Sequence, residues 1–332
     1  MTIENLSRLI EGEILTSPLV FSINNIEFSS KRVKNADAFV YTGIEDIKEA
    51  VSNGAYAVIF DREDVEIFDR EIAWIKVKSL KKALIRILRF YLSEKSIKVF
   101  YANEILSDII KSASLSKNII FLNDSIYDIF QKIFHAKENA TIIGRDKDLL
   151  EKIYPSFKEI EEEKGGFQSI NSSLFENTFL YKGKIFKNIK IPPIFEEELK
   201  KALSFFEKND IDYDLHNLNF IENHFEPVFI NKLFVKKPFG STQKVLIFEK
   251  DKKLLKKEAD FIKKEAKWAK SVVFIPKGEN IEDLGIEIYR FLELKNLKLI
   301  KNFHLGIIYG RKEDFLPLLE DKKTHSISLF EE

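Results

Sequence analysis

Histidine is the residue type in this chain best suited to metal binding or proton transfer, and its spacing indicates neither. The five histidines are His135, His216, His224, His304 and His325. No two of them lie four positions apart, as two ligands on one helix face would, and none has carboxylates at a spacing typical of zinc. We expect each to be exposed or locally hydrogen-bonded, and we predict no metal site and no catalytic residue.

A second chemical possibility lies where an expected strand, 97–102, passes into an expected helix, 103–113. Such a junction binds a nucleotide when glycines let backbone N–H groups surround the phosphates, a lysine reaches the outer phosphates and a hydroxyl binds Mg²⁺. Residues 99–108 read VFYANEILSD, without glycine or lysine. Glu104 and Asp108 place negative charge at the helix start, where it suits the helix dipole and repels a triphosphate. We expect a turn capped by Asn103 and no ATP or Mg²⁺ cofactor.

Composition and missing motifs argue against several further classes of protein. Without cysteine there are no disulfides, thiolate metal sites or cysteine nucleophiles. The 53 basic and 53 acidic residues give a net charge of zero and no reason to expect a nucleic-acid partner. No Gly-x-Ser-x-Gly or Gly-x-Gly-x-x-Gly motif occurs. The first residues lack the order of a signal peptide and no apolar run approaches membrane-spanning length, so we expect a cytoplasmic protein.

The first ninety residues show the alternation of strands and helices of a small α/β domain. Strands are expected at 38–41 and 55–60, with a short helix between them. Gly54 follows this helix and is expected to cap it in the left-handed conformation. A strand at 73–77 and an amphipathic helix at 80–91 complete the pattern.

This segment resembles the N-terminal domain of the Mur ligases, above all the type that adds D-alanyl-D-alanine to the muramyl peptide. The opening motif of that family is close to Asp-Ser-Arg-Lys-Val-Lys-Pro-Gly-Asp-Leu-Phe-Val-Ala, and residues 29–41 read SSKRVKNADAFVY. Residues 49–55 read EAVSNGA, where the family has Glu-Ala-Ile-x-Asn-Gly-Ala. The resemblance implies an α/β protein of three Mur-ligase-like α/β domains, with the central one reduced. The implied domains are a Mur ligase N-terminal-like domain at 1–95, a reduced central α/β domain at 96–240 and a Rossmann-like C-terminal domain at 241–332.

The same resemblance implies a substrate site in the N-terminal domain, which in the family holds the uridine-diphosphate end of the muramyl precursor. It implies Ser29, Ser30 and Lys31 as substrate-binding residues. The loop after Tyr41 is shorter than in the family, and the two serines could instead hydrogen-bond the turn at the strand end. Both interpretations stay open.

Two other family motifs lie opposite altered residues. The phosphate-binding loop of the family matches 99–108, discussed above. The family has a Gly-Arg before a strand, and the nearest match here is Asn223–Pro227, NHFEP, which has no arginine. The Asp-Asp-x-Tyr-Asn-Ala-x-Pro motif of the family lies opposite Val235–Ser241, VKKPFGS, where lysines replace the acidic pair. Farther on we expect a hairpin turning at Lys182 and Gly183, and a helix at 281–294.

Three functions follow from these expectations. The first is a Mur ligase relative of peptidoglycan precursor metabolism that lacks ATPase activity and binds a UDP-muramyl peptide or a Mur enzyme. The second is an active ATP-dependent amide ligase with a divergent nucleotide site, which alone would require ATP and Mg²⁺. The third is a structural interaction protein that binds no ligand.

Overall fold

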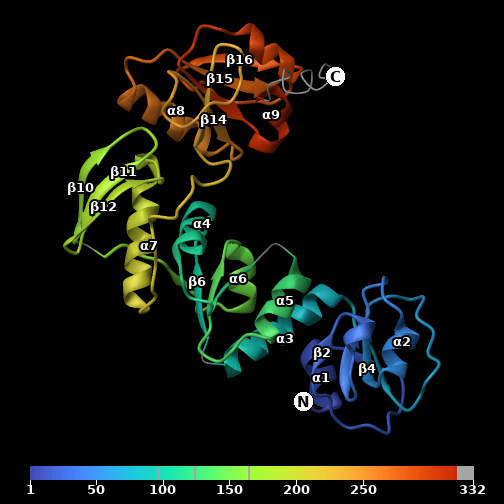
Figure 1. The fold of residues 1–332 in the computed structure, drawn as a ribbon. Coiled ribbons are helices and arrows are strands. Elements are labelled where there is room, and N and C mark those ends of the chain that lie inside the picture. Colours follow the sequence, from blue (N-terminus) through green and yellow to red (C-terminus); the bar gives the residue numbers. More distant parts are fainter. Residues whose placement is uncertain (96, 123–124, 164, 320–332) are drawn as a thin grey trace, which may run out of the picture. The chain divides into compact units, whose positions relative to one another are not determined.

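The computed structural model describes residues 1–95, 97–122, 125–163 and 165–319 (Figure 1). The chain divides into two compact units, which are described separately. Unit 1 comprises residues 1–102 and 117–159, and unit 2 comprises residues 103–116 and the described residues from 160 onward. None of the helices in these ranges is both long enough and apolar enough to cross a membrane.

The first sheet of unit 1 has the strand order β1-β5-β4-β3-β2, in which only β1 is antiparallel to its neighbour. Its elements in chain order are α1 (Ile3–Ile10), β1 (Glu13–Ile14), β2 (Ile26–Glu27), β3 (Asp37–Val40), α2 (Ile47–Ser52), β4 (Ala55–Phe60) and β5 (Ala73–Lys76). The expected strands at 38–41, 55–60 and 73–77 are confirmed as β3, β4 and β5. Gly54 has the expected left-handed conformation, with φ of +101°.

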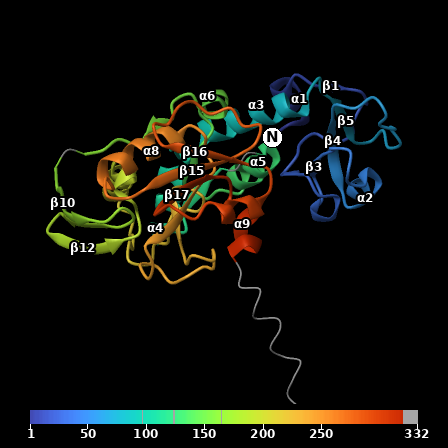
Figure 2. The ribbon, with the colours of Figure 1, turned by 90° about the horizontal axis from the view of Figure 1, so that it is seen from above.

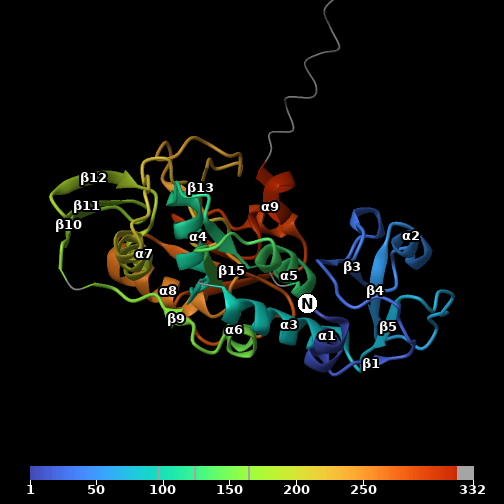
Figure 3. The ribbon, with the colours of Figure 1, turned by 90° about the horizontal axis from the view of Figure 1, so that it is seen from below.

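The second sheet of unit 1 is parallel, with the strand order β7-β8-β6-β9. Its elements are α3 (Leu80–Glu94), β6 (Lys98–Tyr101), β7 (Ile119–Phe121), α5 (Ile126–Phe134), β8 (Thr141–Gly144), α6 (Lys147–Ile153) and β9 (Lys158–Glu159). Helix α3 packs against α1, α5 and α6 (Figures 2 and 3). One apolar core extends through these helices and both sheets, so the two sheets of unit 1 share their hydrophobic interior.

Unit 2 contains a pair of packed helices and a small antiparallel sheet. The elements are α4 (Glu104–Ala113), β10 (Phe167–Ser172), β11 (Asn177–Tyr181), β12 (Lys184–Ile189), the 3₁₀ turn η2 (Pro193–Phe195) and α7 (Glu196–Lys208). Strands β11 and β12 form the expected hairpin around Lys182 and Gly183, both of which have positive φ. Figure 1 shows α7 alongside this sheet.

The remaining sheet of unit 2 has the strand order β13-β14-β17-β15-β16, in which only β13 is antiparallel. Its elements are β13 (Glu226–Ile230), β14 (Lys244–Glu249), α8 (Leu254–Glu265), β15 (Ser271–Pro276), β16 (Glu287–Phe291), η3 (Leu294–Leu299), β17 (Leu305–Tyr309) and α9 (Lys312–Leu319). Strand β13 precedes the boundary expected at residue 241 and yet belongs to this sheet. The division into three domains and its two boundaries stay a prediction.

The helix expected at 281–294 is wrong, because this segment forms strand β16 and the start of η3. Gly285 has φ of +63°, which interrupts a helix. After it, Glu287–Phe291 contains a β-branched residue and two aromatic residues, and the segment pairs in parallel with β15. The pairing with a neighbouring strand therefore decides the structure of this segment.

Candidate functional site

The three substrate-binding residues that the family resemblance implies are consecutive and lie in the connection between β2 and β3 of unit 1. Ser29 precedes a short 3₁₀ turn, η1 (Ser30–Arg32), which lies between β2 and β3. Ser29 is half-buried, Ser30 is buried with 1% of its surface exposed, and Lys31 is exposed. The structure thus offers Ser29 and Lys31 to a ligand more readily than Ser30.

The hydroxyl of Ser30 is held by two carboxylates from the neighbouring segment. Its Oγ lies 2.9 Å from an oxygen of Glu45 and 2.5 Å from an oxygen of Glu49, and its backbone N–H donates to Glu45 at 3.2 Å. The side-chain amide of Asn53 donates to the Ser30 carbonyl at 3.0 Å. A serine has one hydroxyl proton to donate, so these internal bonds use it fully. The hydroxyl of Ser30 thus bonds two carboxylates 15 and 19 positions farther along the chain, and a substrate role for the three residues stays a prediction.

The start of α4, where a phosphate-binding loop would lead into its helix, is closed by the chain's own side chains. Asn103 is the N-cap, and its side-chain oxygen accepts the backbone N–H of Leu106 at 2.8 Å. Its amide nitrogen lies 3.4 Å from an oxygen of Glu198 on α7. Ala102 and Asn103 alone join β6 to α4, without the glycines that let a backbone wrap around phosphates.

Glu104, the first residue of α4, belongs to a network of charged side chains in unit 2. One of its carboxylate oxygens lies 2.7 Å from Nζ of Lys250, and the other lies 3.5 Å from Nε2 of His224. A carboxylate at a helix N-terminus is favoured by the helix dipole, as a bound anion would be. The negative charge at the head of α4 is therefore supplied by the protein itself.

Behind Glu104 the network continues to a buried carboxylate, Glu249, at the end of β14. Oε1 of Glu249 lies 2.8 Å from Nδ1 of His224 and accepts the backbone N–H of Asp251 at 2.6 Å. Its other oxygen accepts the N–H of Phe225 at 3.3 Å. Burial by itself would lower the pKa of His224, but the hydrogen bond and the charge of Glu249 outweigh it and the net effect raises that pKa.

A second carboxylate, Glu258 on α8, is fully buried beside Glu249. Both of its oxygens are buried without a hydrogen-bond partner among the described residues. Burial, and then the negative charge of Glu249, raise the pKa of Glu258 well above its usual range. This direction favours the protonated form of Glu258 beside the Glu249 carboxylate.

The buried members of this network cannot touch a substrate. His224 is 1% exposed and Glu249 and Glu258 are 0% exposed, so a substrate reaches none of these three. The described residues contain no group of three or more His, Asp or Glu side chains arranged to hold a metal ion. His325 lies outside the described residues. The expectation that each histidine is exposed or locally bonded is wrong for His224, which is buried and bonds Glu249, 25 positions away.

A polar cavity of about 740 Å³ lies in unit 2 on the side of α4 that carries Asp108 and Lys111. Its opposite wall is the segment 217–222, together with Glu226 and Lys312, which form an ion pair. The mixed charges and amides of the lining suit a polar ligand better than an apolar one. The sequence patterns do not indicate this cavity, because its walls come from four separate segments.

Sequence reasoning missed the charged network, although two signals for it exist. Glu258 interrupts the apolar positions Leu255, Ala259 and Ile262 of α8, and Glu249 ends an apolar strand. A carboxylate within an apolar stripe is seldom buried without a partner, so such a position indicates either exposure or a special partner. Only the folded chain shows that Glu249 bonds His224 and that Glu258 lies buried beside Glu249.

Comparison with known proteins supports the family likeness at the level of the fold. No family model matches the sequence. Over 102 residues the chain is 32% identical to UDP-N-acetylmuramoyl-L-alanyl-D-glutamate–2,6-diaminopimelate ligase 2 of Clostridium acetobutylicum, which covers 29% of this chain. The match spans 21% of that ligase, about a fifth of its length.

Solved structures match almost the whole chain. A crystal structure of MurF from Acinetobacter baumannii matches with a TM-score of 0.55 and 10% identity over 96% of this chain and 97% of the other. MurF from Thermotoga maritima, solved in complex with ADP, matches with a TM-score of 0.52 and 13% identity over 89% of this chain and 96% of the other. The α/β chain described above, with its several parallel and mixed sheets, therefore has the three-domain fold of the Mur ligases.

Proposed function

We propose that this protein is a non-catalytic relative of the Mur ligases that acts in the cytoplasm in peptidoglycan precursor metabolism. In this proposal it does not turn over ATP, and it binds a UDP-muramyl precursor or a Mur enzyme. The fold and the match to a muramyl-peptide ligase support the substrate class. The loss of the nucleotide site is argued from the residues at the start of α4.

The observation that carries the proposal is the ion pair between Glu104 and Lys250, with 2.7 Å between the charged atoms. A triphosphate at this helix start would meet the Glu104 carboxylate and the cap made by Asn103, and it would find no lysine in the loop to reach its outer phosphates. A ligase that forms an acyl phosphate needs that nucleotide bound in place. The polar cavity beside α4 in unit 2 and, separately, the exposed Lys31 in unit 1 are candidate contacts for a substrate in the absence of ATP.

Calorimetric titration of the full chain with ATP and Mg²⁺ and, separately, with a UDP-muramyl peptide tests this function. We expect no heat with ATP, no ADP release when the muramyl peptide and an amino acid or D-alanyl-D-alanine are added, and saturable heat with the UDP-muramyl peptide. Lys31→Ala should weaken that binding about tenfold, as loss of one charge-assisted contact does. Lys81→Ala, an exposed lysine of the same unit on α3, is the matched control.

Each other result assigns a different function. ATP binding with ADP release would overturn the proposal in favour of an active amide ligase with a divergent nucleotide site. If the folded protein binds neither ligand and also fails to bind purified Mur ligases, a structural interaction protein without ligand remains. Binding of the UDP-muramyl peptide that is unchanged in Lys31→Ala would remove Lys31 from the site and leave the ligand class intact.

A further inference from the structure

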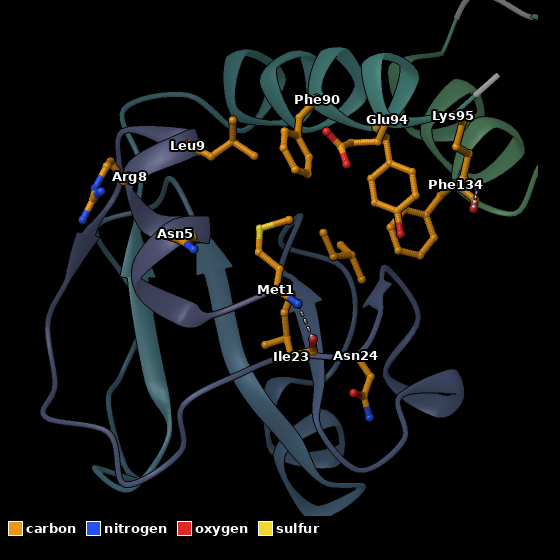
Figure 4. A pocket seen from close by; sticks show the side chains of 12 residues that line it. Met1, Asn5, Arg8, Leu9, Ile23, Asn24, Phe90, Glu94, Lys95 and Phe134 are labelled. Carbon is orange, nitrogen blue, oxygen red and sulfur yellow. Dashed lines mark hydrogen bonds between the residues drawn. The ribbon is translucent and has the colours of Figure 1, made fainter. Parts of the chain in front are cut away.

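Unit 1 contains an apolar cavity of about 740 Å³ that the proposed function does not use (Figure 4). Helices α1, α3 and α5 and the segment 23–26 form its walls. The apolar and aromatic side chains that matter for its chemistry are Leu9, Ile23, Ile26, Phe90, Tyr91 and Phe134. This volume is within the range of about 300–1,000 Å³ that small-molecule sites occupy.

Aromatic rings from two helices supply most of the chemistry of this cavity. Phe90 on α3 is 40% exposed, so its ring meets the cavity and not the core. The rings of Tyr91 and Phe134 pack against each other with their centroids 4.5 Å apart. Burial raises the pKa of Tyr91, so its ring remains a neutral phenol. Neutral aromatic faces attract cations through their quadrupole.

The carboxylate of Glu94 supplies the negative charge of the cavity lining, which also contains Arg8, Lys95 and the ammonium of Met1. Figure 4 shows it pointing from α3 into the cavity beside the ring of Phe90, while the guanidinium of Arg8 points away. No hydrogen bond or ion pair of Glu94 occurs among the residues that the structure describes. The ammonium of Lys95 lies 3.4 Å from the Phe134 carbonyl oxygen, 3.1 Å from the Ala136 carbonyl oxygen and 5.0 Å from the centroid of the Tyr91 ring. The ring of Tyr91 thus already has a cation beside it, and the ring of Phe90 remains for a ligand.

The ammonium of Met1 also lines the cavity, and it donates a hydrogen bond to the carbonyl of Ile23 at 3.1 Å. Lys95 and Met1 thus have carbonyl partners, whereas Glu94 offers both oxygens to a ligand. We propose that this cavity binds a small organic cation with an apolar body, whose charge pairs with Glu94 and lies against the ring of Phe90. The proposal uses neither residues 29–31 nor α4, so it goes beyond the proposed function and is independent of it.

Three probes of similar size and different charge test this proposal on the full chain. They are benzyltrimethylammonium, benzyl alcohol and benzenesulfonate, titrated with calorimetry and with NMR shifts of the α3 amides as the readout. We expect the cation to bind at least about fivefold more tightly than the alcohol, because ring and carboxylate both act on its charge. The sulfonate should bind most weakly of the three.

Two variants assign the effect to its residues. Glu94→Gln keeps the shape and removes the charge, and it should weaken binding of the cation about fivefold while leaving the alcohol unchanged. Phe90→Leu keeps an apolar surface and removes the ring, and it should weaken the cation about threefold. Glu66→Gln, an exposed carboxylate elsewhere in unit 1, is the control and should change nothing. Circular dichroism checks that each variant is folded.

Several results would overturn the proposal. These are equal binding of all three probes, preference for the sulfonate, absence of binding in the folded protein, or cation binding that Glu94→Gln leaves unchanged. None of them bears on whether the protein binds ATP or a UDP-muramyl peptide, so failure here is distinguishable from failure of the proposed function.

Discussion

Nδ1 of His224 lies 2.8 Å from Oε1 of Glu249, and both side chains are almost completely buried in unit 2. A buried carboxylate stays charged only when donors surround it, and here the imidazole and the backbone N–H groups of Phe225 and Asp251 do so. The other nitrogen of the ring faces Glu104 of α4. The histidine therefore connects the end of β14 with the start of α4.

Replacing His224 with phenylalanine should destabilise unit 2 by about 3 kcal/mol near pH 6, because it leaves the charge of Glu249 buried without its partner. The pKa of His224 is raised in the folded state. Its contribution is therefore complete below its unfolded pKa of about 6.5 and is lost as the pH rises through the folded pKa. Hydrogen exchange of the β14 amides, measured from pH 6 to pH 9, reports unit 2 by itself.

His216→Phe, at an exposed histidine of the same unit, is the control for this variant. It should leave the exchange of β14 unchanged at every pH. A His224→Phe deficit that grows with pH would contradict the assigned direction of the pKa shift.

Replacing Glu258 with glutamine should flatten the dependence of the stability of unit 2 on pH. The pKa of Glu258 is raised by burial and by Glu249, so its contribution is present below the unfolded pKa of about 4.3 and is lost as the pH rises toward the folded pKa. Between these two pKa values the free energy of unfolding of the native chain should fall by up to about 1.4 kcal/mol per pH unit because of this group. Glutamine does not titrate, so the variant should lose less.

Urea denaturation at a series of pH values, with exchange of the α8 amides as the local readout, checks this expectation. Glu265→Gln, at the exposed end of the same helix, serves as the comparison and should keep the native slope. Parallel curves for Glu258→Gln and the native chain would show that Glu258 does not titrate in this window.

The ion pair between Glu104 and Lys250 lies at the start of α4, but it should contribute little to the free energy of unfolding. The two side chains are 40% and 28% exposed, so solvent screens their attraction. A double-mutant cycle with Glu104→Gln and Lys250→Met should give a coupling energy of about 0.5–1 kcal/mol that decreases at high salt. A coupling that is insensitive to salt would mean that the pair is shielded from solvent.

The parts of the fold that the sequence predicts are those set by local chemistry. Strands β3 and β4 follow from short apolar runs, and the left-handed cap at Gly54 follows from the conformational freedom of glycine after a helix. The hairpin at Lys182 and Gly183 follows from its turn residues. Each signal lies within a few residues of the element that it specifies.

The parts that the sequence does not predict depend on contacts between distant segments. Strand β16 has an edge position beside β15, and that pairing decides against the helix expected at 281–294. The network of Glu104, His224, Glu249 and Glu258 joins distant parts of the sequence, since Glu104 and Glu258 are 154 positions apart. No local sequence pattern specifies such a network, so it can be identified only in the folded chain.

Alanine substitutions at two glycines with positive φ distinguish two contributions to the loss of stability. One contribution is backbone strain, and the other is a steric clash. Gly54 has φ of +101°, and a Cβ there would lie 2.9 Å from Cα of Asn35, a backbone atom that cannot rotate away. Gly183 has φ of +81°, and a Cβ there would meet no atom within 4 Å. We expect Gly183→Ala to cost about 1 kcal/mol from strain alone, and Gly54→Ala to cost clearly more because the clash adds to the strain.

Hydrogen exchange measures the loss of stability in each variant locally. The amides of β4 report on Gly54→Ala, and the amides of β11 report on Gly183→Ala. The backbone of Asn35 lies in the turn that leads into β3, so the clash should also expose the amides at the start of β3. Equal losses for the two variants, with β3 unchanged, would mean that the turn at Asn35 yields to the added methyl group. The packing of Gly54, after α2, against Asn35, after Ser29, Ser30 and Lys31, would then be less rigid than the close contact indicates.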